Sequence, residues 1–220
     1  FTANVSHELK TPLQSIIGSA ELLENGLVEP EDQPRFLNRI HQEADRLVAL
    51  INDILRLSQL DEGGALPHEQ VSVLELAQEA ARSLTAQAAA QAVHISVTGT
   101  AGTVFGVRRL LYEIARNLCE NAVKYNVPGG SVTVEVAETD RDVTLLVRDT
   151  GIGIPEGDQS RVFERFYRVD KSHSRAIGGT GLGLSIVKHA VAYHHGTLRL
   201  ESQPGKGTVI TVTLPKEPTE

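Results

Sequence analysis

Two runs of apolar residues, spaced by alternating threes and fours, constrain the fold of this chain more than any other feature of its sequence. The first run consists of Leu9, Leu13, Ile16, Ala20, Leu23 and Leu27. The second consists of Leu37, Ile40, Ala44, Leu47, Ile51 and Ile54. This spacing places each run along one side of an α-helix. Because only a short acidic, proline-containing segment, 28–34, separates the runs, we expect an antiparallel helical hairpin.

Each predicted helix also has apolar residues outside its run, more than one partner helix can cover. These additional residues are Ile17, Leu22, Leu50, Leu55 and Leu57. An exposed apolar stripe of this width predicts another packing partner. We therefore expect two copies of the hairpin to form a dimeric four-helix bundle.

The pattern changes after the segment DEGGALP, residues 61–67, which predicts a linker. The later sequence predicts helices over 73–92, 107–125 and 184–194, and strands over 94–99, 131–138, 143–149, 197–202 and 208–214. Such a mixture favours an α/β sandwich with helices on one face of a mostly antiparallel sheet, so the whole chain is of the α+β class. We place the domain limits at 1–62 and 68–216, with a linker at 63–67 and a tail at 217–220.

Composition excludes several classes of function. The net charge is -7, from 28 acidic and 21 basic residues with no basic block, so we expect no nucleic-acid partner. Cys119 is the single cysteine, which excludes an internal disulfide, and we expect it to be buried. No run of 18 apolar residues occurs, and the sequence contains no methionine. We expect a piece of a longer protein that contacts a membrane only through a missing N-terminal part.

The segment NVSHELKTP, residues 4–12, places a polar cluster on the first predicted helix. His7 lies about 180° around the helix from Ile16, so it faces solvent, and Thr11 follows one turn later on the same side. Pro12 cannot donate a hydrogen bond to the carbonyl of Glu8, and we expect a bend there. A neutral imidazole beside a carboxylate can act as a nucleophile, but this stretch alone favours a solvated surface histidine.

The predicted helix 107–125 has a polar face that indicates a ligand. Asn117, Asn121 and Tyr125 recur every four residues, with Lys124 beside them. Asparagine is unfavourable inside a helix because its side chain competes for backbone hydrogen bonds. Amide oxygens suit Mg²⁺ and a lysine suits phosphate, so this face is a candidate binding surface.

Two glycine-rich segments add to that candidate. In DTGIGIP, Asp149 can accept a hydrogen bond from an amino group such as that of adenine, and Gly151 and Gly153 permit close backbone approach. The segment GGTGLGL, 178–184, directly precedes a predicted helix, whose free N–H groups would attract phosphate. Either segment alone can be an ordinary turn. Their combination with the asparagine helix predicts a nucleotide pocket.

The segment between the two glycine clusters, 155–180, has little periodicity and is too long for an idle loop. Phe163 and Phe166 can anchor it, while Arg165 and Arg168 can reach phosphates. We predict a lid over the pocket. The alternative is a surface helix with a solvated charged face.

Over nearly its whole length the chain resembles the catalytic core of a bacterial sensor histidine kinase. SHELKTPL is similar to the phosphoacceptor box of that family, NLCENAVKY to its asparagine box and FERFYR to its phenylalanine box. DTGIGIP and GTGLGLSIVK are similar to its two glycine boxes. The resemblance implies a dimerisation and phosphotransfer hairpin followed by an ATP-binding domain of the type shared by histidine kinases, Hsp90 and gyrase. It also implies the cytoplasmic portion of a membrane-anchored bacterial sensor.

The resemblance further implies a role for particular residues. His7 would be phosphorylated with help from Glu8, and Thr11 would position water when the enzyme dephosphorylates its partner. Asn121, assisted by Asn117, would hold Mg²⁺. The other implied ATP-binding residues are Lys124, Tyr125, Asp149, Gly151, Gly153, Ile154, Arg168, Thr180, Gly181, Leu182 and Gly183. The implied partners are a second copy of the chain and the receiver domain of a response regulator, whose aspartate accepts the phosphoryl group.

Two alternatives remain open from the sequence. A nucleotide-binding dimeric pseudokinase would share the same fold, as would an ATPase of the chaperone or topoisomerase type, although those ATPases have a glutamate where this chain has Asn117. The chain also departs from the family at Gly106-Val107, where relatives usually have an acidic residue after the glycine. We expect the missing helix N-cap to reduce stability and to leave activity intact.

Overall fold

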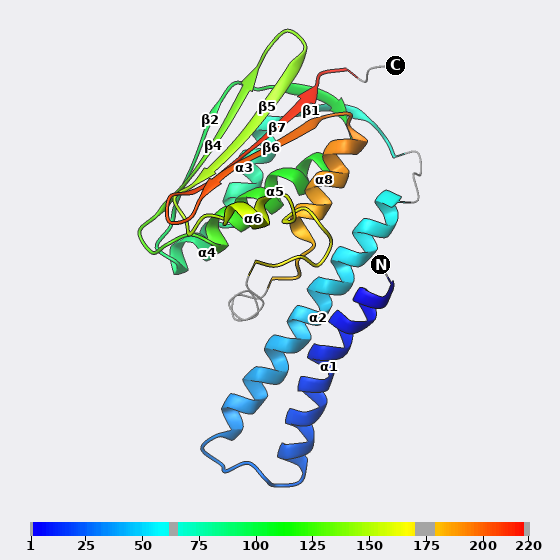
Figure 1. Ribbon diagram of the computed structural model, residues 1–220, viewed down its shortest axis with the longest axis vertical. Coiled ribbons are helices and arrows are strands. Elements are labelled where there is room, and N and C mark those ends of the chain that lie inside the picture. Colours follow the sequence, from blue (N-terminus) through cyan, green and yellow to red (C-terminus); the bar gives the residue numbers. More distant parts are fainter. Residues whose placement is uncertain (1, 62–65, 170–178, 218–220) are drawn as a thin grey trace.

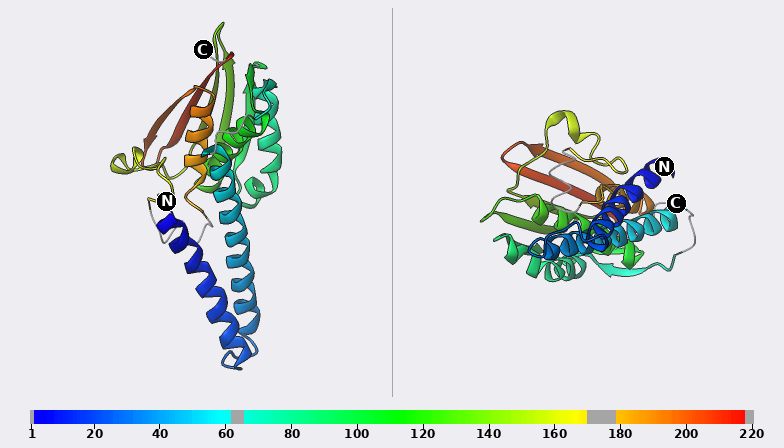
Figure 2. Two further views of the ribbon diagram at one scale, coloured as in Figure 1. Left: turned by 90° about the vertical axis from the view of Figure 1, so that its right-hand side faces the viewer. Right: turned by 90° about the horizontal axis from the view of Figure 1, so that it is seen from below.

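A computed structural model describes residues 2–61, 66–169 and 179–217 as a long helical hairpin attached to an α/β domain (Figure 1). The hairpin consists of α1 (Thr2–Glu24) and α2 (Gln33–Asp61). Pro12 lies within α1, which is a single helix from end to end. Figure 2 shows the hairpin extending away from the α/β domain. The predicted helical hairpin is confirmed; residues 62–65 of the linker region, 170–178 of the lid, including Gly178, and 218–220 of the tail lie outside the described residues.

The α/β domain contains a five-stranded sheet in the order β2-β4-β5-β7-β6. Its strands are β2 (His94–Gly99), β4 (Ser131–Glu138), β5 (Asp142–Asp149), β6 (Thr197–Gln203) and β7 (Gly207–Pro215). Only the β2–β4 pair in this sheet is parallel. Alternate residues such as Val132, Val134 and Val136 are buried, because side chains of a strand point to opposite faces.

Helices cover the buried face of this sheet, as the sequence predicted (Figures 1 and 2). They are α3 (Val73–Ser83), α4 (Thr85–Ala90), α5 (Arg108–Lys124) and α8 (Gly183–Tyr193). α5 supplies Ile114, Leu118 and Cys119 to the core, and burial raises the pKa of the Cys119 thiol to about 12. A short helix, α6 (Glu156–Gln159), lies in the segment predicted as a lid, and a small unpredicted sheet pairs β1 (Glu69–Ser72) with β3 (Thr103–Gly106).

The single helix predicted over 73–92 is wrong, because the structure divides it at Leu84. The Ser83 hydroxyl donates to the carbonyl of Ala80 at 2.7 Å, and the Thr85 hydroxyl donates to the carbonyl of Arg82 at 2.9 Å. Such side-chain bonds compete with the helical backbone ladder. The apolar spacing continued through a break that these two hydroxyls stabilise.

The expectation that a second hairpin covers all the additional apolar residues is wrong for Leu50 and Leu57. Both are buried within the chain by Leu182 and Ile186 of the α/β domain, in a cluster that we call the interdomain cluster. The apolar residues still exposed on the hairpin are Leu13, Ile17, Leu22, Leu27, Leu37, Val48, Ile51 and Leu55. Within the described ranges, neither α1 nor α2 nor any shorter helix has the length and apolar character needed to cross a membrane.

Candidate nucleotide-binding and phosphoacceptor site

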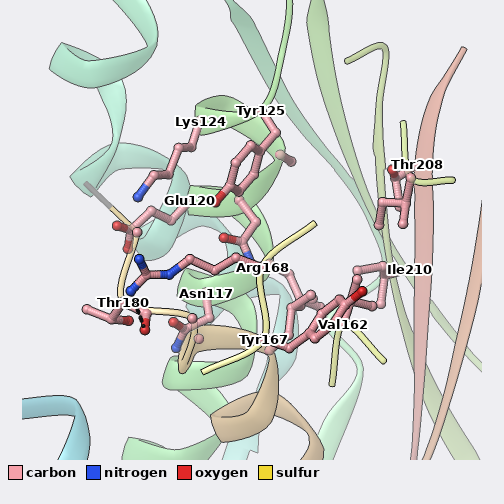
Figure 3. A pocket seen from close by; sticks show the side chains of 18 of the residues that line it. Asn117, Glu120, Lys124, Tyr125, Val162, Tyr167, Arg168, Thr180, Thr208 and Ile210 are labelled. Carbon is pink, nitrogen blue, oxygen red and sulfur yellow. Dashed lines mark hydrogen bonds between the residues drawn. The ribbon is translucent and has the colours of Figure 1, made fainter. Parts of the chain in front are cut away.

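A cavity of about 410 Å³ lies between α5, the end of β5, the lid segment and α2. Figure 3 shows it extending from Lys124 and Thr180 at one end to Thr208 and Ile210 at the other. Segments far apart in the sequence therefore meet at one cavity. The predicted ATP-binding residues that line it are Asn117, Asn121, Lys124, Tyr125, Asp149, Gly153, Ile154, Arg168, Thr180, Gly181 and Gly183.

Two predicted ATP-binding residues do not line the cavity. Gly151 is buried behind it, where its N–H donates to Asp149 Oδ1 at 2.8 Å. Leu182 has its side chain in the interdomain cluster, completely buried. The structure thus gives Gly151 and Leu182 supporting places next to residues that face the cavity.

α5 presents its polar face to the cavity. Asn117 is nearly buried, and its Nδ2 donates to the backbone carbonyl of Glu113 at 2.8 Å and to Glu113 Oε2 at 3.3 Å. Gly183 begins α8 beside it, and a Cβ at that position would lie 2.9 Å from Asn117 Oδ1. The absence of a side chain at Gly183 therefore lets the N-terminus of α8 approach Asn117.

Asp149 forms the base of the cavity at the end of β5. Two backbone N–H groups, of Gly151 and Thr208, donate to its Oδ1 at 2.8 and 3.2 Å. Burial raises the pKa of this carboxyl group, and the two hydrogen bonds act in the opposite direction. Within the described residues, Oδ2 accepts no hydrogen bond, so it can face an exocyclic amino group.

Positive side chains and α8 mark the opposite end of the cavity. Burial lowers the pKa of the Lys124 ammonium group, while the nearby Glu120 carboxylate raises it. Arg168 Nη2 donates to the Thr180 carbonyl at 3.1 Å. Figure 3 shows Lys124 and Thr180 at the same end of the cavity, with the guanidinium of Arg168 directed toward them. This end is suited to phosphate.

The bundle helix α2 closes the phosphate end, which the sequence did not predict. Ala49, Asn52, Asp53 and Arg56 all line the cavity. Thr180 Oγ1 donates to Asp53 Oδ2 at 2.8 Å, and Arg56 Nη1 lies 3.3 Å from Glu113 Oε2. These residues lie outside the apolar run of α2, so the sequence did not indicate that they contact the α/β domain.

The predicted phosphoacceptor residues lie at the edge of this arrangement. His7 is exposed on α1, as predicted, and does not line the cavity. Glu8 Oε2 pairs with Arg168 Nη2 at 3.0 Å, and this pair connects the acceptor patch, which consists of His7, Glu8 and Thr11, to the lid segment. Thr11 Oγ1 donates to the His7 carbonyl at 3.2 Å.

The donor set of the cavity fits a hard cation accompanied by phosphates. The described residues contain no group of three His, Cys, Asp or Glu side chains that could hold a metal by themselves. Asn117, Asn121 and Glu120 nevertheless bring amide and carboxylate oxygens to the cavity. Mg²⁺ commonly takes one or two protein oxygens and completes its shell with water and substrate phosphates. The residues therefore fit Mg²⁺ in company with a nucleotide.

Comparison with known proteins identifies the two domains of the chain. Residues 1–63 match the model of the His Kinase A (phospho-acceptor) domain, and residues 106–218 match that of the histidine kinase-, DNA gyrase B- and HSP90-like ATPases. The sensor-like histidine kinase SenX3 of Mycolicibacterium smegmatis is 42% identical over 99% of this chain and 57% of its own length. The sensor histidine kinase WalK of Bacillus subtilis is 37% identical over 98% of this chain and 36% of its own length.

Solved structures show the same fold. The histidine kinase AdeS of Acinetobacter baumannii superposes with a TM-score of 0.77 at 20% identity, over 96% of this chain and 98% of that one. ShkA, solved full-length in complex with AMPPNP, has a TM-score of 0.71 at 28% identity over 97% of this chain and 45% of its own. The chain spans only about half the length of the SenX3 proteins that it matches. From its two matched domains and these relatives, the chain belongs to the sensor histidine kinases of bacterial two-component systems, whose phospho-acceptor and ATPase core it represents.

Proposed function

We propose that this chain transfers the γ-phosphoryl group of Mg²⁺-bound ATP to His7 and then to an aspartate in the receiver domain of a response regulator. The observation that supports this most directly is the pair between Glu8 and Arg168 at 3.0 Å. Arg168 lines the nucleotide cavity, and Glu8 adjoins the exposed His7. The acceptor patch and the donor pocket are therefore in contact through one ion pair.

The cavity residues have distinct tasks in this proposal. Asp149 accepts a hydrogen bond from the adenine amino group, and Tyr125 lines the nucleotide. Lys124 and Arg168 neutralise phosphate charge, while the N-terminus of α8 provides backbone N–H groups. Asn121 and Asn117 hold the Mg²⁺, which when bound contributes charge neutralisation on the phosphates.

The transfer itself is a simple exchange of bonds. A ring nitrogen of neutral His7 attacks the γ-phosphorus, so a nitrogen–phosphorus bond forms and the bond to the ADP oxygen breaks. The carboxylate of Glu8 accepts the ring proton from the other nitrogen. Because Glu8 is paired with Arg168 in the present arrangement, this step requires the lid arginine to exchange Glu8 for the phosphates.

Labelling with γ-³²P-ATP tests the proposal. We expect acid-labile, base-stable label on the protein, abolished by His7→Gln and retained by His41→Gln, an exposed histidine of α2 that pairs with Asp45. Label that persists in His7→Gln would contradict the assignment of the acceptor. Steady phosphate release without labelled protein would instead favour an ATPase, and nucleotide binding with neither outcome would favour a pseudokinase.

A second proposed activity is the hydrolytic removal of phosphate from the response regulator, in which Thr11 positions the water. Thr11→Ala should slow dephosphorylation of a phosphorylated receiver domain and leave labelling of His7 largely intact. Equal loss of both activities would remove Thr11 from this role.

Asn121→Asp should impair labelling with the fold preserved, and unchanged labelling would exclude Asn121 as a metal ligand.

The exposed apolar residues of the hairpin support a homodimer. Leu13, Ile17 and Leu22 of α1, with Ile51 and Leu55 of α2, are all at least 39% exposed. A second hairpin would bury them in a four-helix bundle. Equilibrium sedimentation should give twice the chain mass, and a monomer at micromolar concentration would contradict this.

We further propose domain limits at 1–62 and 68–216, and that the chain is the cytoplasmic portion of a membrane-anchored sensor.

A further inference from the structure

We propose that Glu113 is a positioning residue for the nucleotide site, which fixes the amide of Asn117 in the orientation that a Mg²⁺-nucleotide requires. The inference rests on the proposed function, because it assigns Asn117 to the metal side of the site. Glu113 belongs to no motif that the sequence singled out. It lies one helical turn before Asn117 in α5 and does not line the cavity.

The geometry places the carboxylate of Glu113 directly behind Asn117. The side chain of Glu113 is 8% exposed, and its Oε2 accepts a hydrogen bond from Asn117 Nδ2 at 3.3 Å. The same Nδ2 donates to the Glu113 carbonyl at 2.8 Å. Both acceptors therefore hold the amino group of the amide on the side away from the cavity.

An ionised carboxylate can only accept hydrogen bonds, so it selects one of the two orientations of the amide. With Nδ2 on Glu113, Oδ1 points toward Gly183 at the start of α8. An amide oxygen attracts a hard cation or its water, whereas the amino group in that place would repel it. Side chains that orient metal-site groups from behind commonly affect metal affinity about 10- to 100-fold.

The charge of Glu113 is balanced from the other domain. Arg56 Nη1 of α2 lies 3.3 Å from Glu113 Oε2 and 3.5 Å from Asp53 Oδ1. A nearly buried carboxylate is costly unless it is paired, and Arg56 provides the pair. The orientation of Asn117 thereby depends on a residue of the bundle helix, which links the position of α2 to the nucleotide site.

Binding of a fluorescent ATP analogue to the whole chain tests this role. Glu113→Gln keeps the size of the side chain, but its own amide can donate to Asn117 Oδ1, so the backbone carbonyl of Glu113 alone still favours the original orientation. We expect the Mg²⁺ concentration that gives half-maximal binding enhancement to rise about tenfold. Nucleotide affinity in excess EDTA should change less than about twofold. Glu79→Gln, which removes an exposed partner of Arg108, is the matched control and should match the wild type.

A purely structural role predicts a different result. Glu113→Gln would then lower the melting temperature and leave the Mg²⁺ dependence unchanged, which would overturn the proposal. If Glu113→Gln does not fold, Arg56→Gln decides. Arg35→Gln, which removes an exposed partner of Asp32 in the hairpin, is its control. A raised Mg²⁺ requirement in Arg56→Gln supports the proposal, and an unchanged one overturns it. Wild-type chain that binds no Mg²⁺-nucleotide would contradict the proposed function itself, which separates the two failures.

Discussion

The contact between Asp53 and Thr180 predicts that α2 competes with ATP. The Thr180 hydroxyl has one proton, which it donates to Asp53 Oδ2 at 2.8 Å. Thr180 belongs to the glycine-rich segment proposed to hold phosphates, so a phosphate oxygen that accepts from this hydroxyl would have to displace the Asp53 carboxylate. Removing the charge of Asp53 should therefore tighten nucleotide binding.

The size of the effect follows from the chemistry of the bond. A hydrogen bond to a charged acceptor contributes about 1.5–3 kcal/mol, and a neutral one about 0.5–1.5 kcal/mol. Asp53→Asn keeps an acceptor in place and loses roughly 1–1.5 kcal/mol of the competing interaction. This difference corresponds to roughly five- to tenfold tighter binding. Removal of charge repulsion between Asp53 and the phosphates acts in the same direction.

A fluorescent ATP analogue titrated with Mg²⁺ present measures this change. Asp45→Asn is the matched control, because Asp45 lies on the same helix and is exposed. Burial also raises the pKa of Asp53, so this carboxylate is protonated at a higher pH than an exposed one. As the pH is lowered, the difference in nucleotide affinity between the wild type and Asp53→Asn should therefore shrink. Unchanged or weaker binding in Asp53→Asn at neutral pH would refute the competition.

Three further predictions concern stability. Burial lowers the pKa of His194, whose Nε2 accepts the Val107 N–H at 3.0 Å. The contribution of neutral His194 to the free energy of unfolding is therefore present above the unfolded-state pKa of about 6.5, and it is lost as pH falls through the lower folded-state pKa. Urea titrations should show less pH-dependent loss between pH 7 and 5 in His194→Gln, and an identical loss would exclude His194. Gly153 has φ +69° and faces the carbonyl of Gln203, so Gly153→Ala should cost at least about 1 kcal/mol of unfolding free energy and weaken nucleotide binding; wild-type values for both would contradict the strain. Leu118 is 2% exposed, so Leu118→Ala should lower the free energy of unfolding by about 2–5 kcal/mol. A loss below about 1 kcal/mol in the same urea titrations would show that neighbouring core side chains fill the space left by Leu118.

The sequence predicted those parts of the fold that depend on regular spacing. The apolar periodicity of 9–27 and 37–54 was sufficient for the hairpin, and the alternation in 131–138 and 143–149 was sufficient for the central strands. It failed at Leu84, because a helix break set by two hydroxyl groups does not disturb the apolar spacing. It also missed β1 and β3, which are short and pair across a long sequence separation.

The candidate site divides in the same way. Residues in glycine-rich or asparagine-rich segments could be predicted, because their side chains are unusual for the element that contains them. Asp53, Arg56 and Glu113 could not, because charged residues on a helix ordinarily face solvent. Their contacts depend on how the two domains pack, and that packing is set by Leu50 and Leu57 against Leu182 and Ile186. The same packing explains why part of the apolar surplus of α2 is covered within one chain.

The start of α5 lacks a side-chain cap, and a histidine of another helix end lies beside it. Val107 provides no side-chain cap, as the sequence predicted. His194 of a different segment accepts the Val107 N–H at Nε2, and His194 Nδ1 lies 2.8 Å from the Ala190 carbonyl. A neutral ring that donates from Nδ1 and accepts at Nε2 satisfies both groups. A capping side chain would accept the N–H of the second or third residue of α5, so the stability cost expected from the missing cap stays a prediction.

Phosphorus NMR of the chain after incubation with Mg²⁺-ATP tests the central claim most directly. The account predicts a phosphoramidate resonance on the protein that disappears on acidification and is missing from His7→Gln. A phosphate-ester resonance, a phosphoramidate that survives in His7→Gln, or free phosphate with no modified protein would contradict it.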